Sequence, residues 1–337
     1  MKILENYDLT KLNTFGISAQ AKFLAEVKSE RDFLELIQTP EFKNNEKLFL
    51  GGGSNVLFTK DFNGIVVLNK LKGIEIIKEN TENVWLKAMG GEWWNDLVLF
   101  SVEKGFWGIE NLSLVPGTVG AAPVQNIGAY GAEVKDNLEE VEALDIQTGQ
   151  KKIFSKKECA FGYRDSVFKN KLKGKYFITA VVFKLSKKKN KNTNYKALQD
   201  YLAENKLEIK SSKDASEIIA DIRRGKLPDP KILGNAGSFF KNVYVDIDKL
   251  LELELQYSEV PSFEEGEKIK IPAGWLIEQC GWKGKRIGNV GVHEKQALVL
   301  VNYGGATGQE ILDLANQIID SVFQKFGLKL TPEVNLI

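Results

Sequence analysis

Two segments made mainly of small residues limit what this sequence can fold into more than any other feature. The first is Gly51–Asn55, three glycines followed by serine and asparagine, and the second extends over residues 116–131. Glycine has no Cβ, so its backbone N–H can approach a phosphate group closely, and serine and asparagine add hydrogen bonds. A plain turn between strands explains the first segment equally well when it is taken alone. Together, the two segments favour a site for a large cofactor that carries a diphosphate.

The composition excludes several classes of protein. The chain has 337 residues, enough for about two domains. Its 46 Lys and Arg residues nearly balance 45 Asp and Glu residues, which argues against a dedicated nucleic-acid-binding protein. The two cysteines, Cys159 and Cys280, cannot form a disulfide framework, so we expect free thiols in a reducing compartment. The single histidine, His293, excludes a His–His metal centre, and no metal site is expected.

The sequence also lacks the marks of export or membrane insertion. Its N-terminal residues do not form the continuous apolar run of a signal peptide. Apolar runs such as Phe177–Phe183 fall far short of the ~20 residues that a membrane-spanning helix needs. We therefore expect a cytoplasmic protein that does not insert into a membrane.

The spacing of apolar residues predicts short strands in the first two-thirds of the chain and a few helices. The predicted helices are Trp94–Lys104, Asp214–Lys226 and Thr307–Phe326, and the first and last are followed directly by glycine. The predicted strands are Lys47–Leu50, Gly64–Leu68, Val84–Ala88, Lys175–Lys184 and Lys329–Leu336, with a hairpin over Leu138–Phe154. A solvated basic loop is expected at Lys184–Lys191, and a second region begins near residue 205.

Three further segments carry residues that could take part in chemistry. Arg164 lies between aromatic residues, where its planar guanidinium could clamp a carboxylate, although a surface ion pair with Asp165 explains it equally well. Ser238 lies between Gly237 and a pair of phenylalanines, which suggests an exposed hydroxyl beside an apolar wall. Its surroundings are not the GxSxG of a nucleophile elbow. Glu333, taken alone, is typical of a surface charge. P-loop and Rossmann motifs are absent.

These segments occur with others in a fixed order. They are TFG at 14–16, LGGGSN at 50–55, PGTVGAAPVQNIGAYG at 116–131, YRDSVFK at 163–169, GNAGSFFKN at 234–242, AGWLIEQCGWKG at 273–284, GVHEKQALVLVN at 291–302 and PEV at 332–334. Each motif alone is weak, but the ordered combination covers nearly the whole chain. It closely resembles the UDP-N-acetylenolpyruvoylglucosamine reductase family, the flavoenzymes of peptidoglycan precursor synthesis.

The resemblance implies an α+β fold of the vanillyl-alcohol-oxidase type (also called PCMH-type), in which two subdomains bind FAD and a C-terminal α+β domain binds substrate. We place the FAD-binding region at residues 1–200, with a subdomain boundary near 70, and the substrate domain at 205–337, where the last strand returns Glu333 to the active site. The implied reaction is reduction of non-covalent FAD by NADPH, then transfer of hydride to the enolpyruvyl group of a UDP-sugar to give UDP-N-acetylmuramate. NADPH and the UDP-sugar would use one site in turn.

The resemblance also assigns roles to individual residues. It implies Arg164, Ser238 and Glu333 as catalytic residues, with Ser238 as the proton donor to C2. The implied substrate-binding residues are Tyr195, Lys226, Asn242 and Gln296, and Tyr195 places the chain in the longer type of the family. The cofactor-binding residues are expected to be Gly51, Gly52, Gly53, Ser54, Asn55, Pro116, Gly117, Thr118, Gly120, Ala121, Gln125, Asn126, Gly128, Ala129 and Tyr130.

Two alternatives to this function stay open at the level of sequence. The first is another flavin oxidase or dehydrogenase of the same superfamily, against which the Ser238 and Glu333 segments argue. The second is a nucleotide-binding module without enzymatic activity, which would lack a yellow chromophore that NADPH bleaches. We expect a monomer, although the sequence does not fix the oligomeric state, and no nucleic-acid partner. His293 receives no catalytic role, and Cys280 is predicted to lie in the core.

Overall fold

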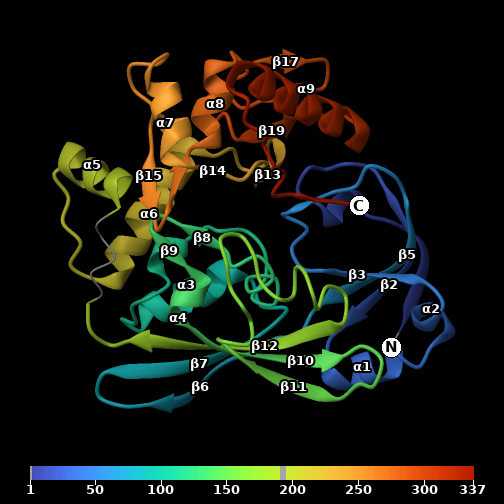
Figure 1. Ribbon diagram of the computed structural model, residues 1–337. Helices are drawn as coiled ribbons and strands as arrows, with labels where there is room; N and C mark the ends of the chain where they lie inside the picture. The colour runs from blue at the N-terminus through green and yellow to red at the C-terminus, as the bar shows by residue number, and fades with distance from the viewer. Residues whose placement is uncertain (1, 190–194) are drawn as a thin grey trace. The chain divides into compact units, whose positions relative to one another are not determined.

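The computed structural model describes residues 2–189 and 195–337, and the chain divides into two compact units. The first unit consists of residues 1–7, 20–53 and 62–225. The second consists of residues 8–19, 54–61 and 226–337. Each unit therefore combines segments that are distant in sequence, and Figure 1 shows the path of the chain by colour.

The N-terminal part of the first unit is built on a four-stranded sheet with the order β1-β2-β5-β3. Strands β2 and β3 both pair with β5 in parallel, and the chain between them forms short helices. The α1 helix begins at a capping box, in which Ser29 and Asp32 satisfy each other's backbone N–H groups. The bounds are β1 Ile3–Asp8, β2 Gln20–Val27, α1 Glu30–Leu36, α2 Pro40–Lys43, β3 Glu46–Leu50 and β5 Phe62–Asn69.

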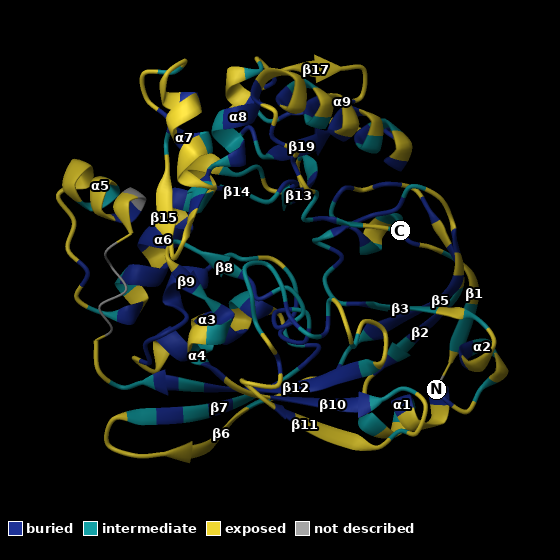
Figure 2. Cartoon of the chain, in the orientation of Figure 1, coloured by how far each residue is buried: buried dark blue, intermediate teal, exposed yellow. Residues whose placement is uncertain are grey.

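The rest of the first unit is built on a five-stranded antiparallel sheet with the order β11-β10-β12-β7-β6. Its central strand β12 is almost entirely buried, whereas the edge strand β6 is exposed (Figure 2). The bounds are β6 Ile74–Glu79, β7 Asn83–Met89, β10 Leu138–Asp145, β11 Lys151–Ser155 and β12 Tyr176–Ser186. The shorter elements of this unit are α3 Trp94–Glu103, η2 Glu110–Leu112, β8 Gly128–Ala129, β9 Ala132–Glu133, α4 Val134–Asn137, α5 Lys196–Asn205 and α6, which covers Ser212–Lys226.

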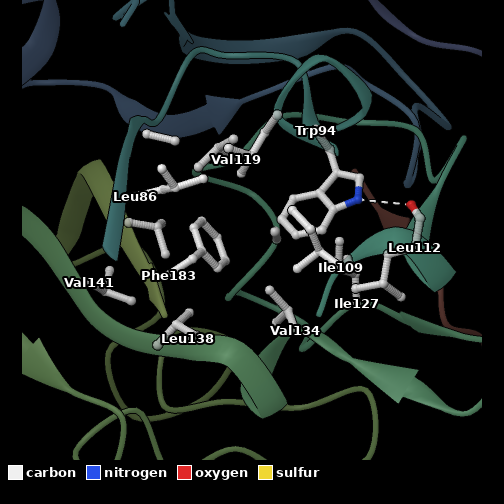
Figure 3. Close-up of a cluster of buried hydrophobic side chains, with 14 of the residues drawn as sticks. Leu86, Trp94, Ile109, Leu112, Val119, Ile127, Val134, Leu138, Val141 and Phe183 are labelled. Atoms are coloured by element: carbon white, nitrogen blue, oxygen red, sulfur yellow. Dashed lines mark hydrogen bonds between the residues drawn. The ribbon is translucent and has the colours of Figure 1, made fainter. Parts of the chain in front are cut away.

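Helices α3 and α4 cover one face of this sheet and close a core around the Trp94 indole (Figures 1 and 3). The Trp94 side chain is fully buried, and its Nε1 donates a hydrogen bond to the Leu112 carbonyl at 2.9 Å. Leu86 of β7, Val141 of β10 and Phe183 of β12 supply the sheet side of the same core. The indole nitrogen is thus satisfied although it is buried, as a stable core requires.

The second unit contains two small antiparallel sheets, with the orders β13-β19-β18-β17 and β14-β16-β15. The C-terminal strand β20 pairs in parallel with β4, which explains why residues 54–61 belong to this unit. The bounds are η1 Thr10–Leu12, β4 Val56–Leu57, β13 Gly234–Ser238, β14 Val243–Val245, α7 Ile247–Glu254, β15 Phe263–Glu265, β16 Lys268–Ile271, α8 Ala273–Gln279, β17 Arg286–Ile287, β18 Val290–Val292, β19 Val299–Asn302, α9 Gly308–Phe326 and β20 Asn335–Leu336.

The structure confirms the strongest predicted elements. Helix α9 begins at a capping box formed by Thr307 and Glu310 and ends at Gly327, which adopts the left-handed conformation. Helices α3 and α6 and the hairpin of β10 and β11 also lie where the apolar pattern predicts them. No helix among residues 2–189 and 195–337 is long and apolar enough to span a membrane.

Three local predictions need correction. Of the strand predicted at Lys329–Leu336, only Asn335–Leu336 pairs as a strand, and Pro332 within it has no backbone N–H to donate. The predicted basic loop begins later than expected because β12 continues to Ser186, and residues 190 and 191 lie outside the described residues. Cys280 follows the last residue of α8 and is half-buried, so it is not a core residue.

Candidate active site

The two glycine-rich segments meet within the first unit. A Cβ on Gly51 would lie only 2.4 Å from Thr118 Oγ1, and one on Gly52 would lie 3.0 Å from the Gly117 Cα. The first distance is shorter than real Cβ contacts and the second is at their tight limit, so a larger residue at either position would force a neighbouring group to shift. Backbone N–H groups of segments without Cβ atoms are suited to binding a phosphate group.

Gly120 is also constrained by contacts within the protein. A Cβ at this position would lie 3.0 Å from the Gly90 carbonyl oxygen and 3.2 Å from Asn69 Nδ2. The Gly120 N–H also donates to the Gly90 carbonyl at 2.9 Å. A bulky residue at position 120 would therefore disturb packing within the protein itself, and loss of cofactor in such a variant could not be assigned to direct exclusion.

Asn126, another predicted cofactor residue, stabilises the second segment through buried hydrogen bonds. It is fully buried in a left-handed conformation, and its Nδ2 donates to the Gly162 carbonyl at 2.9 Å. Its Oδ1 accepts from the Lys135 N–H at 3.1 Å. These bonds fix the loop next to Arg164. The other predicted cofactor residues of this segment, Pro116, Ala121, Gln125 and Ala129, also belong to the first unit.

Arg164 lies at the far end of the same segment. Its Nη2 donates to the Gly128 carbonyl at 2.6 Å, and a Cβ on Gly128 would lie 2.8 Å from Nη1. The guanidinium also lies over the Tyr163 ring, 5.3 Å from its centroid. Asp165, the partner in the alternative surface ion pair, accepts two hydrogen bonds from Asn170 at 2.8 and 2.9 Å. Arg164 is thus held against the glycine-rich segment by its bond to Gly128.

A cluster of two tyrosines and an arginine forms beside this segment, and sequence reasoning missed the arginine. Tyr195 packs edge-to-face on Tyr130 at 5.7 Å between ring centroids, and it also covers Gly131. Burial raises the pKa of Tyr130, and nearby Arg223 opposes that rise. Arg223 of α6 donates only a long bond of 3.4 Å to the Leu114 carbonyl, and its buried Nε has no partner among the described residues.

The unsatisfied Nε of Arg223 is informative because a buried N–H donor without a hydrogen-bond partner is costly. Burial lowers the pKa of this guanidinium, so the group would gain from an anionic partner. Arg223 is one of two adjacent arginines on a predicted helix, and nothing in the surrounding sequence distinguishes it from a surface charge. Arg224, its neighbour, is such a charge and pairs with Asp221 at 2.8 Å.

In the second unit, the structure brings Ser238 and Glu333 together. Ser238 ends β13, directly after Gly237 in the left-handed conformation. The Phe239 carbonyl next to it accepts the Glu333 N–H at 2.8 Å, so the two candidates lie on adjoining stretches of backbone. Asn55, at the end of the first glycine-rich segment, donates from Nδ2 to the Glu333 carbonyl at 3.4 Å. Ser54 belongs to the same stretch of the second unit.

Asn242 and Gln296 also converge, at the beginning of α8. Asn242 Oδ1 accepts the Ala273 N–H at 3.1 Å, and a Cβ on Gly274 would lie 3.5 Å from Gln296 Oε1. Lys226 is exposed and is the last residue of α6. Its position fits both of its predicted explanations, a phosphate contact and a charge at a helix end.

Cys159 and His293 are the remaining residues with shifted pKa values that could be considered for chemistry, and burial is the main cause of each shift. Burial raises the pKa of the Cys159 thiol to about 12, which leaves it unreactive. Partial burial lowers the pKa of His293, whose Nδ1 accepts a weak bond from the Lys295 N–H at 3.4 Å. Neither residue lies in the glycine-rich segments.

Comparison with known proteins agrees with this geometry. Residues 21–153 match the model of an FAD binding domain, and residues 229–337 match the C-terminal domain of UDP-N-acetylenolpyruvoylglucosamine reductase. The first match covers both the Gly51–Asn55 turn and the second segment that packs against it. We call the contact of Gly51 and Gly52 with Gly117 and Thr118 the cofactor cradle. The fold and this cradle together define a protein of the FAD-binding class.

Full-length relatives narrow this class to one family. The chain is 48% identical to the UDP-N-acetylenolpyruvoylglucosamine reductase of Flavobacterium johnsoniae and 49% identical to that of Amoebophilus asiaticus, over 100% of each chain. The chain belongs to the UDP-N-acetylenolpyruvoylglucosamine reductase family. A crystal structure of the reductase from Thermus caldophilus has the same fold, with a TM-score of 0.68, 21% identity, and coverage of 99% of this chain and 98% of that one.

The comparisons confirm the family, the α+β FAD-binding fold and the broad class of activity predicted from the sequence. The protein is an FAD-dependent oxidoreductase of peptidoglycan precursor synthesis.

Proposed function

We propose that the protein catalyses the NADPH-dependent reduction of the enolpyruvyl group of UDP-N-acetyl-3-O-(1-carboxyvinyl)-glucosamine to UDP-N-acetylmuramate. When bound, FAD accepts hydride from NADPH and supplies it to C3 of the enolpyruvyl group. NADPH and the UDP-sugar use one site in turn, so that the first product leaves before the UDP-sugar binds. The full-length relatives with this printed name support the substrate class.

Non-covalent FAD is the resident cofactor in this proposal, and two observations support a bound ligand that carries a diphosphate. Gly51 and Gly52 pack against Thr118 and Gly117 so tightly that a Cβ would not fit, which leaves backbone N–H groups to meet a diphosphate. The buried Nε of Arg223, which lacks a partner among the described residues, fits an anionic or strongly accepting group of a ligand. FAD offers such groups, and both observations concern residues of the first unit.

The protein's own residues stabilise the charge that develops on the substrate. After hydride reaches C3, the electron pair of the C2–C3 double bond moves to C2 and into the adjoining carboxylate as an enolate. Arg164 stabilises this charge with N–H donors that the bond to Gly128 holds in place. Glu333 assists as a neutral acid or through a water molecule, because an ionised carboxylate would repel the enolate.

Ser238 completes the addition by donating the proton that C2 needs. The observation that most supports this role is the 2.8 Å bond between the Glu333 N–H and the Phe239 carbonyl, which holds Glu333 beside the serine. A short strand end that follows a left-handed glycine also fixes where the Ser238 backbone lies. A positioned proton donor of this kind contributes about 10²–10⁴-fold in rate.

Four residues bind the rest of the substrate in this proposal. Tyr195 and Lys226 contact the diphosphate of the UDP group, the tyrosine through its hydroxyl and the lysine as a point charge. Asn242 and Gln296 make further polar contacts to the substrate. Both lie where α8 begins, so one short region of the second unit presents two amide groups.

The proposal is tested by incubating the purified protein with NADPH and the UDP-sugar and analysing the product by mass spectrometry. The expected product is heavier than the substrate by two hydrogen atoms, and one NADPH is consumed for each product formed. A product of unchanged mass, or NADPH oxidation that does not depend on the UDP-sugar, would contradict the proposed reaction.

A further inference from the structure

Trp93 is an unusually exposed aromatic residue for its place beside the cofactor cradle. About 48% of its surface is accessible, although it directly precedes the buried Trp94. A Cβ on Gly52 would lie 2.8 Å from the Trp93 ring, so the indole lies directly against the first glycine-rich segment. Its backbone pairs with Thr118 of the second segment. Trp93 therefore adjoins both segments and still leaves much of its ring uncovered.

The neighbouring Trp94 is fully buried, in contrast to Trp93. The Trp94 side chain points into the core of the five-stranded sheet and donates to the Leu112 carbonyl at 2.9 Å (Figure 3). The Trp94 N–H donates to the Gly117 carbonyl at 3.0 Å, which fixes the backbone next to Trp93. The backbone at Trp93 is thus fixed next to the second glycine-rich segment.

The orientation of the cofactor follows from the two ends of the second segment. At one end, Gly117 and Thr118 lie against Gly52 and Trp93. At the other end, Gly128 lies against Arg164, which our proposed function places at the reacting carboxylate. The flavin ring must lie at the Arg164 end, because hydride passes from it to the substrate there. The adenosine half of FAD then extends toward Trp93.

We propose, resting on this proposed function, that Trp93 stacks against the adenine of FAD and makes the site selective for FAD over FMN. A purine offers a flat π-surface of the size that an indole covers, and such stacking is one of the stronger contacts available to a base. FMN has the flavin and one phosphate but no adenine. It would gain nothing from Trp93, whereas FAD would.

The test measures flavin selectivity in the holoenzyme. Purified holoenzyme is equilibrated with an equimolar mixture of FAD and FMN, the protein is separated by ultrafiltration, and the bound flavins are quantified by chromatography. Replacing an aromatic stacking partner by alanine costs about 1–3 kcal/mol per base, which corresponds to a change of roughly 5- to 150-fold in affinity. Trp93→Ala should therefore shift the bound ratio toward FMN by about tenfold or more.

Three further variants separate stacking from general damage. Trp93→Phe keeps an aromatic face and should stay close to the wild-type ratio, whereas Trp93→Leu fills space against Gly52 without stacking and should shift the ratio as alanine does. Leu99→Ala removes another exposed apolar side chain, 44% accessible, from the same helix and should leave the ratio unchanged. An unchanged ratio in both Trp93→Ala and Trp93→Leu overturns the inference, although FAD binding itself stands. A wild-type protein that binds neither flavin contradicts the proposed function instead.

Discussion

The two units of this protein carry candidate functional residues of different kinds. In the first unit, Gly51 and Gly52 lack a Cβ where the two segments pack together, and an added Cβ would force a neighbouring group to shift. In the second unit, the catalytic candidates Ser238 and Glu333 would act through their own side chains. A backbone hydrogen bond between Glu333 and Phe239 holds the two stretches of chain together. Substitutions that add side-chain atoms are therefore expected to disturb the cradle, whereas substitutions that remove side-chain atoms are expected to disturb the catalytic pair.

The difference predicts how substitutions separate cofactor binding from chemistry. Changes in the cradle should lower flavin content and leave the chemistry of any remaining holoenzyme intact. Changes at the catalytic pair should leave flavin content intact and slow one half-reaction.

The largest effect is expected for Ser238→Ala. This variant should keep its flavin and be reduced by NADPH at the wild-type rate, because the proton donor acts only after hydride leaves the flavin. Oxidation by the UDP-sugar should slow by roughly 10²-fold or more. Stopped-flow absorbance measures the two half-reactions separately. Ser258→Ala, at an exposed serine of the same unit, is the matched control. Equal losses in both half-reactions would indicate a folding or binding defect and would remove the role of Ser238 as proton donor.

The second prediction concerns the cradle. Gly51→Ala should lower bound flavin, because the new Cβ would lie 2.4 Å from Thr118 Oγ1 and overpacking of this kind costs about 1–3 kcal/mol. The obstructing atom belongs to a side chain, so Gly51→Ala combined with Thr118→Ala should recover part of the flavin content. Flavin per protein is measured by absorbance. If the double variant binds less flavin than Gly51→Ala, steric conflict with Thr118 is not the cause.

Close packing of the two glycine-rich segments has a direct trace in the sequence. A glycine that close packing favours is visible in the sequence as a glycine, and Gly51, Gly52 and Gly128 all make such contacts. The sequence was less informative about which contact forces each one. Gly120 packs against Gly90 and Asn69 of the protein itself, and Asn126 braces its own loop.

Arg223 could not have been found from the sequence because its distinguishing property is environmental. Arg223 and Arg224 are adjacent and chemically identical, and only folding buries one and pairs the other with Asp221. The strand predicted at Lys329–Leu336 was too long for a related reason. Its apolar residues suit a strand, but only the last two pair with β4, which lies nearly 280 residues earlier in the chain.

The predicted domain limits, 1–200 and 205–337, stay a prediction. The compact units of the folded chain include two short early segments, residues 8–19 and 54–61, in the second unit. The parallel pairing of β20 with β4 and the bond from the Asn302 amide to the Phe15 carbonyl, at 2.8 Å, account for their place there. No local pattern in those segments announces such distant partners.

The third prediction concerns the substrate diphosphate. Lys226→Ala should weaken UDP-sugar binding by about tenfold, since a hydrogen bond to a charged group contributes about 1.5–3 kcal/mol, and Tyr195→Phe should weaken it less. Both variants should keep an unchanged flavin spectrum. Each is titrated with the UDP-sugar and with an enolpyruvyl fragment that lacks UDP. Equal loss of affinity for both ligands would refute the diphosphate role and leave Lys226 as a charge at the end of α6.

The smallest effect is expected at Glu110 of η2, a buried carboxyl of the first unit that is not part of the proposed chemistry. Burial raises its pKa above the ordinary value of 4.5, although a bond from the Gly108 N–H opposes the rise. The folded state therefore holds this proton at a pH where the unfolded chain has released it. Its contribution to stability is fully present below about pH 4.5 and is lost as the pH rises through the raised pKa.

Glu110→Gln removes this titration and should flatten the fall in the melting temperature between pH 4.5 and neutrality. Scanning calorimetry at a series of pH values measures the difference between the variant and the wild type. Glu103→Gln, at an exposed carboxyl of α3, is a control that should follow the wild-type profile. Parallel profiles for wild type and Glu110→Gln would show that Glu110 is not protonated in the folded protein.

The central claim is that one chain binds FAD and passes electrons from NADPH to the enolpyruvyl group of the UDP-sugar. The most direct test is the visible spectrum of the purified protein under anaerobic conditions. The account predicts flavin absorption bands that NADPH bleaches and that stoichiometric UDP-sugar restores. A colourless protein, or a reduced flavin that the UDP-sugar does not reoxidise, would contradict it.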